Sequence, residues 1–150
     1  MPCIVELSAI YQALSLGQNE PMKIYKGKWF VRFARKENIS DTKLCEAVKN
    51  AEFGLIDADY GDGVIKQRIA RPNKGKSGGY RSIILFRKEH RSFFVYGFSK
   101  KERENLDESE ERDFKDLAKV LLDAAEADIV RMVEERRFIE VMCDEQDIQG

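Results

Sequence analysis

The sequence predicts an α+β domain, in which a small antiparallel β-sheet has helices packed on one side. Three observations lead to this fold class. Runs of β-branched and aromatic residues in the middle of the chain are linked by short turns, capped helical segments flank them, and a length of 150 residues suits one domain with its own core. Hydrophobic residues make up 43% of the chain and charged residues 35%, so we expect a folded domain with a highly charged surface.

Two elements are expected in the N-terminal part of the chain. Residues 4–16 carry apolar side chains near helical spacing, which indicates a helix. The run KWFVRFARK (28–36) is rich in aromatic and β-branched residues, which is typical of a strand. An open reading frame could begin at Met22, so residues 1–21 are interpreted as an extension on a domain that starts at residue 22.

A capped helix is expected directly after this strand. Ser40 has the side chain of an N-cap, and Ile39 and Leu44 have the spacing of a hydrophobic staple. Gly54 supplies the stop, and residues 57–63 (DADYGDG) follow as a turn. The expected apolar face of this helix comprises Leu44, Ala47, Val48 and Ala51.

Three strands form the centre of the predicted sheet. VIKQRIA (64–70) alternates in character, and YRSIILFR (80–87) and SFFVYGF (92–98) are apolar and aromatic. Only the segment Lys88 to Arg91 separates the last two strands, so these strands are expected to pair as a tight hairpin. Strands that are joined in this way run antiparallel.

Two helices and a short strand are expected after the sheet. Asp107 and Glu110 have the spacing of a capping box at the start of the first helix. A second helix is expected near 126–136, and the sequence FIEVM after it suits a short strand. We therefore expect segment 107–150, an acidic helical extension, to pack on the same domain as residues 22–106. The expected apolar face of the first helix comprises Phe114, Leu117, Ala118, Leu121 and Ala125.

Charge is distributed unevenly along the chain, although the formal net charge is only -1. Residues 64–103 hold 12 Lys/Arg and 2 Asp/Glu, whereas residues 104–150 hold 6 and 16. A basic segment of this kind can bind a polyanion. A structural interpretation stays open beside this one, in which a basic sheet pairs with acidic helices inside one fold.

The cysteines and the hydropathy pattern indicate a cytoplasmic protein. Cys3, Cys45 and Cys143 are odd in number, widely spaced and form no C-x-x-C motif, so we expect free thiols and neither a metal site nor a disulfide framework. No apolar run approaches the roughly 18 residues that a membrane span requires. The N-terminus lacks the basic leading region and the apolar stretch of a secretory signal.

Candidate site residues are concentrated in the basic segment. Alternation puts Lys66 and Arg68 on one face of their strand. Arg81 opens the next strand beside two glycines, which would let its guanidinium reach out of the sheet. Single-stranded RNA requires cations for its phosphates and flat side chains for its bases. The expected RNA-binding residues are Arg71, Lys74, Lys76, Tyr80, Tyr96, Lys100 and Arg103.

Neither an ATP-binding loop nor histidine catalysis is expected. The segment GKSGG lacks the complete G-x-x-x-x-G-K-S/T pattern, and it leads into a strand instead of a helix. The sole histidine, His90, lies in the predicted hairpin turn, where we interpret it as a solvated residue. In cleavage of RNA by its neighbouring 2′-hydroxyl, a lysine among like charges can transfer protons and an arginine can stabilise the developing oxyanion. Lys66, Arg68 and Arg81 could supply these groups, or they could bind phosphates without any chemistry.

One succession of features extends across VIKQRIARPNKGKSGGYRSIILFR and SFFVYGFSKKERENL. It consists of a basic strand, a loop, Gly-Tyr-Arg at the start of a strand, an aromatic strand and Lys-Lys-x-Arg. In this pattern the chain, from about Met22 to Leu106, resembles the RelE/ParE superfamily of toxin–antitoxin toxins, and most of all its RelE-like and HigB-like branch. RelE-like toxins are ribosome-dependent endoribonucleases that cut mRNA and stop translation, and their fold is a small antiparallel sheet with helices.

The resemblance implies a cytoplasmic, metal-independent mRNA interferase that needs no cofactor, acts on the ribosome and its mRNA, and is inhibited by an antitoxin encoded by an adjacent gene. Arg81 matches the arginine that follows Gly-Tyr, and Lys101 stands where some members have a catalytic arginine. A C-terminal tyrosine that some members use has no counterpart here. Two alternatives stay open: a ParE-like inhibitor of DNA gyrase, and a non-catalytic RNA-binding module. The candidate catalytic residues are Lys66, Arg68, Arg81 and Lys101.

Overall fold

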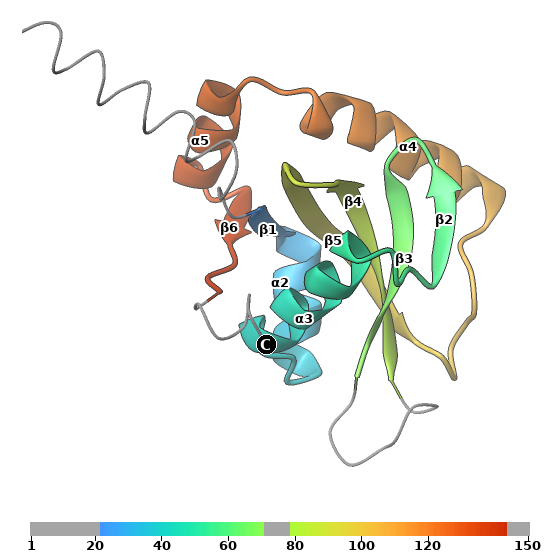
Figure 1. The fold of residues 1–150 in the computed structure, drawn as a ribbon. Coiled ribbons are helices and arrows are strands. Elements are labelled where there is room, and N and C mark those ends of the chain that lie inside the picture. Colours follow the sequence, from blue (N-terminus) through green and yellow to red (C-terminus); the bar gives the residue numbers. More distant parts are fainter. Residues whose placement is uncertain (1–21, 71–78, 144–150) are drawn as a thin grey trace, which may run out of the picture.

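The computed structural model describes residues 22–70 and 79–143 (Figure 1). The helix expected at 4–16 and the loop cations Arg71, Lys74 and Lys76 lie outside the described residues. The elements in chain order are β1 (Lys23–Gly27), α2 (Lys28–Lys36), α3 (Asp41–Glu52), β2 (Ala58–Gly61), β3 (Val64–Ile69), β4 (Tyr80–Arg87), β5 (Arg91–Ser99), α4 (Glu108–Leu122), α5 (Glu126–Glu134) and β6 (Phe138–Glu140).

The described strands form one sheet in the order β2-β3-β4-β5-β1-β6. β1 pairs with β5 in parallel, and the other neighbouring strands are antiparallel. The predicted hairpin between β4 and β5 is present, with its turn at residues 88–90. The α+β class and the antiparallel centre of the sheet are therefore confirmed.

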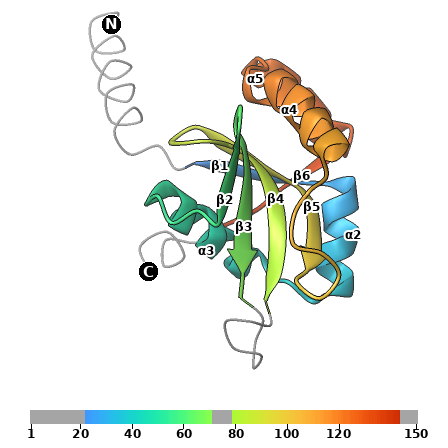
Figure 2. The same cartoon turned by 90° about the vertical axis from the view of Figure 1, so that its right-hand side faces the viewer.

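Helices cover both faces of the sheet and not one side alone (Figures 1 and 2). α2 and α3 pack with Ile65 and Ile84 in one hydrophobic cluster, whereas α4 and α5 pack with Val64 and Leu85 in another. Successive residues of a strand point to opposite faces. Because the central strands are apolar at consecutive positions, both faces of the sheet have to be buried.

Segment 28–36 is helix α2, so the prediction of a strand there is wrong. Phe30 and Ala34 are its buried residues, and they lie one helical turn apart. Arg35 and Lys36 occupy the last turn, where cations interact favourably with the helix dipole. The helical spacing of the apolar residues thus prevails over their aromatic and β-branched composition.

Segment 57–63 is more than the predicted turn, because residues 58–61 form strand β2. Asp62 and Gly63, which both have positive φ angles, make the turn from β2 into β3. A Cβ atom at Gly63 would lie 2.6 Å from Leu122 Cδ1, so glycine also lets this turn approach α4 closely. β2 is short and lies at the edge of the sheet, which gives it little apolar signal in the sequence.

Both predicted helix caps are present. The Ser40 side chain accepts a hydrogen bond from the Lys43 N–H at the start of α3. Asp107 and Glu110 form the complete capping box of α4. The predicted apolar face of α3 is buried, but the face of α4 is corrected in part: Leu117 is exposed, and Ala125 lies beyond the helix as the N-cap of α5.

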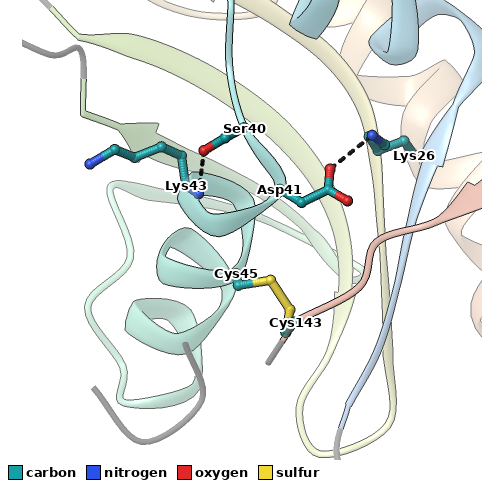
Figure 3. The surroundings of a disulfide bond; sticks show 6 residues. All are labelled: Lys26, Ser40, Asp41, Lys43, Cys45 and Cys143. Carbon is teal, nitrogen blue, oxygen red and sulfur yellow. Dashed lines mark hydrogen bonds and ion pairs between the residues drawn. A yellow bond between two sulfur atoms is a disulfide. The ribbon is translucent and has the colours of Figure 1, made fainter. Parts of the chain in front are cut away.

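Cys45 and Cys143 form a disulfide bond, so the expectation of free thiols is wrong for these two residues (Figure 3). Their Cα atoms are 6.0 Å apart, a usual separation for a disulfide. β6 pairs with β1, and the Val141 N–H donates to the Ile24 carbonyl, which brings the chain after β6 against α3. A sequence separation of 98 residues hides this proximity from any spacing rule.

Candidate nucleic-acid interface

Three of the four predicted catalytic residues lie together on β3 and β4. Arg68 and Arg81 are direct cross-strand partners, and Lys66 lies two residues before Arg68 on the same strand face. Alternation from Val64 puts this face toward α4 and α5. The structure therefore brings together the three side chains that the sequence pattern selected.

Lys66 is held tightly inside the fold and is only 9% exposed. Its Nζ donates to Glu104 O at 2.9 Å and to Asn105 Oδ1 at 2.7 Å, and lies 3.3 Å from Asp57 Oδ2. An ammonium group has three N–H bonds: two of them donate to Glu104 O and Asn105 Oδ1, and Asp57 adds an ion pair.

Asp57 is a charged member of this cluster that sequence reasoning missed. The same Oδ2 atom that contacts Lys66 lies 3.3 Å from Nε of Arg81. The side chain of Asp57 is 31% exposed, so its carboxylate lies at the solvent boundary. Asp57 reaches these cations only because β2 pairs with β3, whereas the sequence predicts a turn at residues 57–63.

The two arginines keep more of their hydrogen-bonding capacity. Nη1 of Arg81 makes a long contact of 3.5 Å with Tyr80 O, and its Nη2 has no acceptor among the described residues. Nε of Arg68 is buried without a hydrogen-bond partner in the described part of the chain. Gly79 lies beside them, and a Cβ atom there would be 2.7 Å from Ile69 O, so this approach requires glycine.

Lys100 and Lys101 emerge at the same end of the sheet. Tyr80 pairs with Ser99 across β4 and β5, so the residues after Ser99 leave the sheet close to Arg81. Both lysines are exposed and make no ion pair with the residues that the structure describes. These two cations are therefore accessible to solvent.

Arg103, which the sequence predicts to bind RNA, has several partners within the fold. Its guanidinium forms a two-point ion pair with Glu110, donates to Asn105 O, and lies 5.4 Å from the centre of the Phe98 ring. The hydrogen bond to Glu110 raises the pKa of Arg103 and lowers the pKa of the Glu110 carboxyl. This pair fastens the segment after β5 to the N-terminus of α4.

The predicted RNA-binding tyrosines are also in packed positions. Tyr80 is buried in the cluster with α2 and α3, and its hydroxyl donates to Glu37 Oε2 at 2.6 Å. Tyr96 is partly buried, with its ring centre 4.5 Å from that of Trp29 and 6.1 Å from that of Phe114. Trp29 is 40% exposed, so it carries the accessible aromatic surface of this group.

At the opposite end of the sheet, two cations of the basic segment bind the C-terminus of α4. Arg91 is buried and donates to Leu121 O at 3.0 Å, to Ala124 O at 2.9 Å and to Glu126 at 3.3 Å. Arg87 donates to Leu122 O and to Asp123. The structural interpretation, in which a basic sheet pairs with acidic helices, applies at this end.

Within residues 22–70 and 79–143, no group of three or more His, Cys, Asp or Glu residues could hold a metal ion. No helix in the same ranges is long and apolar enough to cross a membrane.

A protein-family comparison identifies the relatives of this chain. The family of the RelE toxin of the RelE / RelB toxin-antitoxin system matches residues 22–141. The chain belongs to the RelE toxin family. No match to an individual curated protein was found. As a RelE toxin it belongs to a toxin–antitoxin system, which implies an antitoxin partner, and the match includes α4, α5 and β6 as well as the basic segment.

Proposed function

We propose that this RelE toxin inhibits translation by ribosome-dependent cleavage of mRNA. The observation that carries the proposal is the grouping of Arg68, Arg81, Lys100 and Lys101 at one end of the sheet, with hydrogen-bonding capacity left for a ligand. Phosphate groups are the ligands that such a set of guanidinium and ammonium groups favours. Arg71, Lys74 and Lys76, which the sequence predicts to bind RNA, lie between the two strands in the sequence and outside the described residues.

Each cation has a different task in this proposal. Lys100 and Lys101 bind the RNA backbone from their exposed positions. Arg68 and Arg81 contact the scissile phosphate, and Arg81 stabilises the negative charge that develops on it as the O2′–P bond forms and the P–O5′ bond breaks. Water takes the proton of the 2′-hydroxyl and supplies one to the leaving 5′-oxygen. Because the guanidinium is always protonated, it contributes charge and hydrogen bonds but no proton transfer.

The proposal includes a cognate antitoxin, encoded by an adjacent gene, that covers this group of cations. Acidic side chains on the antitoxin would be steered toward the cations and would speed association. Action on the ribosome places the toxin in the cytoplasm. Co-expression with the adjacent gene product should restore growth; continued arrest with a soluble, expressed product would exclude that product as the antitoxin.

Arg81→Ala tests the proposed chemistry. We expect about a hundredfold loss of ribosome-dependent mRNA cleavage, which corresponds to about 3 kcal/mol of transition-state stabilisation. The melting temperature should fall by only a few degrees, because the Arg81 side chain is 13% exposed but its partner Asp57 keeps Lys66 as a second cation. Arg32→Ala, an exposed arginine on α2, is the matched control and should cleave like the wild type. Wild-type cleavage by Arg81→Ala would exclude a catalytic Arg81.

Pulse labelling after induction in cells separates the proposed target from the alternatives. Early loss of protein synthesis is expected for a ribosome-dependent nuclease. Early loss of DNA synthesis would instead favour a ParE-like action on gyrase. RNA binding by the purified toxin without any cleaved product would favour a non-catalytic RNA-binding module.

A further inference from the structure

Asp57 connects the two strands of the proposed site at a single atom. Its Oδ2 lies 3.3 Å from Arg81 Nε on β4 and 3.3 Å from Lys66 Nζ on β3. No other carboxylate of the described residues contacts either cation. The proposed function assigns no role to this residue.

The backbone of Asp57 is fixed to the core. Its N–H donates to Oε1 of Gln67 at 3.2 Å, and Gln67 is a buried residue on the opposite face of β3. The Gln67 amide donates in turn to Ala47 O at 3.0 Å and to Leu55 O at 2.8 Å. The buried Gln67 amide thus joins three segments by hydrogen bonds: Asp57, the chain at Leu55, and helix α3 at Ala47.

Lys66 is in no position to transfer a proton or to bind a phosphate in this arrangement. Its ammonium group donates to Glu104 O and Asn105 Oδ1 and pairs with Asp57, and the residue is only 9% exposed. A phosphate oxygen would have to enter this nearly closed site and compete with these partners. Lys66 therefore fits a different task, in which it holds the Asp57 carboxylate in place.

We propose that Asp57 is a positioning residue for Arg81, with Lys66 as its anchor. The carboxylate pairs with the guanidinium at Nε, which leaves the two terminal nitrogens for a phosphate. These two nitrogens form one of the guanidinium edges that can make two parallel hydrogen bonds to a phosphate, in exchange for the long contact of Nη1 with Tyr80 O. The inference rests on the proposed function, since it concerns the arginine assigned to the scissile phosphate.

A carboxylate at this point is not required for the fold in the same way as an apolar core residue. The side chain is 31% exposed, and the partners of Lys66 on the chain after β5 remain when Asp57 is changed. Asp57→Asn keeps the shape but removes the charge that holds Nε. Asp57→Glu keeps the charge and shifts it by one methylene.

Steady-state cleavage assays on purified toxin, with programmed ribosomes as substrate, test the inference. We expect Asp57→Asn to lower kcat about tenfold to hundredfold with a smaller change in KM, and Asp57→Glu to recover part of the loss. Asp62→Asn removes the same charge from the same hairpin and should leave kcat unchanged. In an Arg81→Ala background, Asp57→Asn should cost nothing further, because its effect acts through Arg81.

A spectroscopic measurement provides a result that does not depend on cleavage. In the wild type, the Nε–H proton of Arg81 should give a slowly exchanging NMR signal, assigned by its absence in Arg81→Ala. Asp57→Asn should abolish this slow exchange, whereas Asp62→Asn should retain it. Unchanged exchange in Asp57→Asn would overturn the inference even if the toxin cuts no RNA.

The remaining outcomes separate the inference from the proposed function. Loss of activity in Arg81→Ala with full activity in Asp57→Asn would overturn positioning and leave the proposed function standing. A further loss from Asp57→Asn in the Arg81→Ala background, together with disappearance of the acidic limb of the pH–rate profile, would overturn positioning in favour of a direct proton-accepting role. Full cleavage by Arg81→Ala would contradict the proposed catalytic role on which the inference rests.

Discussion

The two ends of the central sheet carry the same cationic residue types but engage them differently within the fold. At the hairpin end, Arg87 and Arg91 donate to backbone carbonyls at the C-terminus of α4. At the loop end, where β3 ends and β4 begins, Arg81 keeps one terminal nitrogen without an acceptor among the described residues, and Lys100 and Lys101 are exposed. The difference depends on the neighbouring helix, because the last carbonyls of a helix lack partners and attract cations. The number of positive charges along the chain does not distinguish the cations of the two ends. The hydrogen-bond acceptors around each cation do.

Substitution of Arg91 at the hairpin end should produce the largest change in the free energy of unfolding. Arg91→Ala leaves the carbonyls of Leu121 and Ala124 without their donor and opens a space beside α4. We expect a loss of about 3 kcal/mol in the free energy of unfolding, measured by urea denaturation. The comparison predicts that this loss comes from the fold and not from a ligand site.

Lys88 provides the control on the same hairpin. It is exposed in the turn beside Arg87, and Lys88→Ala should change the free energy of unfolding by less than about 0.5 kcal/mol. If Arg91→Ala were as stable as Lys88→Ala, the structural role of the hairpin end would be refuted.

The Arg103–Glu110 pair sharpens the comparison at the loop end, where one cation of the segment is structural. Glu110 has a lowered pKa in the folded protein because Arg103 donates to its carboxylate. The stabilisation is therefore present above the unfolded pKa of glutamate and is lost as the pH falls through the folded pKa. Urea denaturation should show Glu110→Gln about 1 kcal/mol less stable than the wild type at pH 7, with the gap closing in acid.

Glu111→Gln is the matched control for this titration, since it removes a charge one residue away from the capping box. Glu111 pairs with Lys115 on the helix surface, and its substitution should give a smaller and less pH-dependent difference. A gap between Glu110→Gln and the wild type that persisted unchanged at pH 2 would argue against the assigned pair.

The lysines of the loop end should have the smallest effect on stability. Lys100→Ala and Lys101→Ala should each change the free energy of unfolding by less than about 0.5 kcal/mol. Each should instead reduce the salt dependence of binding to a single-stranded RNA by about 0.7 in the log–log slope, because one phosphate contact is lost. Fluorescence titrations at several salt concentrations measure this slope. Lys88→Ala should leave it unchanged, and an equal effect of Lys88→Ala would show that binding is not localised at the loop end.

Much of the fold could be predicted because local signals there agree with the tertiary structure. The caps at Ser40 and Asp107 use side chains that bond backbone groups a few residues away, so the sequence contains the whole interaction. Strands β3 to β5 are short apolar runs, and a turn at residues 88–90 separates the last two. The prediction of a strand at 28–36 was wrong because it relied on aromatic and β-branched composition. Phe30 and Ala34 have helical spacing, and this spacing determines the structure of the segment.

The candidate site could be predicted only in part, for a related reason. Alternation along one strand correctly placed Lys66 and Arg68 on a common face, and a cross-strand register then set Arg81 beside them. Asn105 comes from a distant segment, and Asp57 reaches Lys66 only through the pairing of β2 with β3, which the sequence did not predict. The sequence therefore indicated which cations lie close together, but not which of them already contact acceptors within the fold.

The Cys45–Cys143 bond has a mechanical consequence. It closes a ring that contains β2 to β6, α4 and α5, while β1 and α2 lie outside it and β1 inserts between β5 and β6 of the ring. A force applied to the two chain ends would pass from Cys45 directly to Cys143, so the enclosed segment bears no tension. With a sequence separation of 98 residues between the cysteines, the oxidised protein should unravel to a contour about 340 Å shorter than the reduced one. Pulling on the two termini of the oxidised toxin would therefore extend only the parts of the chain outside the ring. The enclosed segment, which includes β3 and β4, would be extended only after the disulfide is reduced.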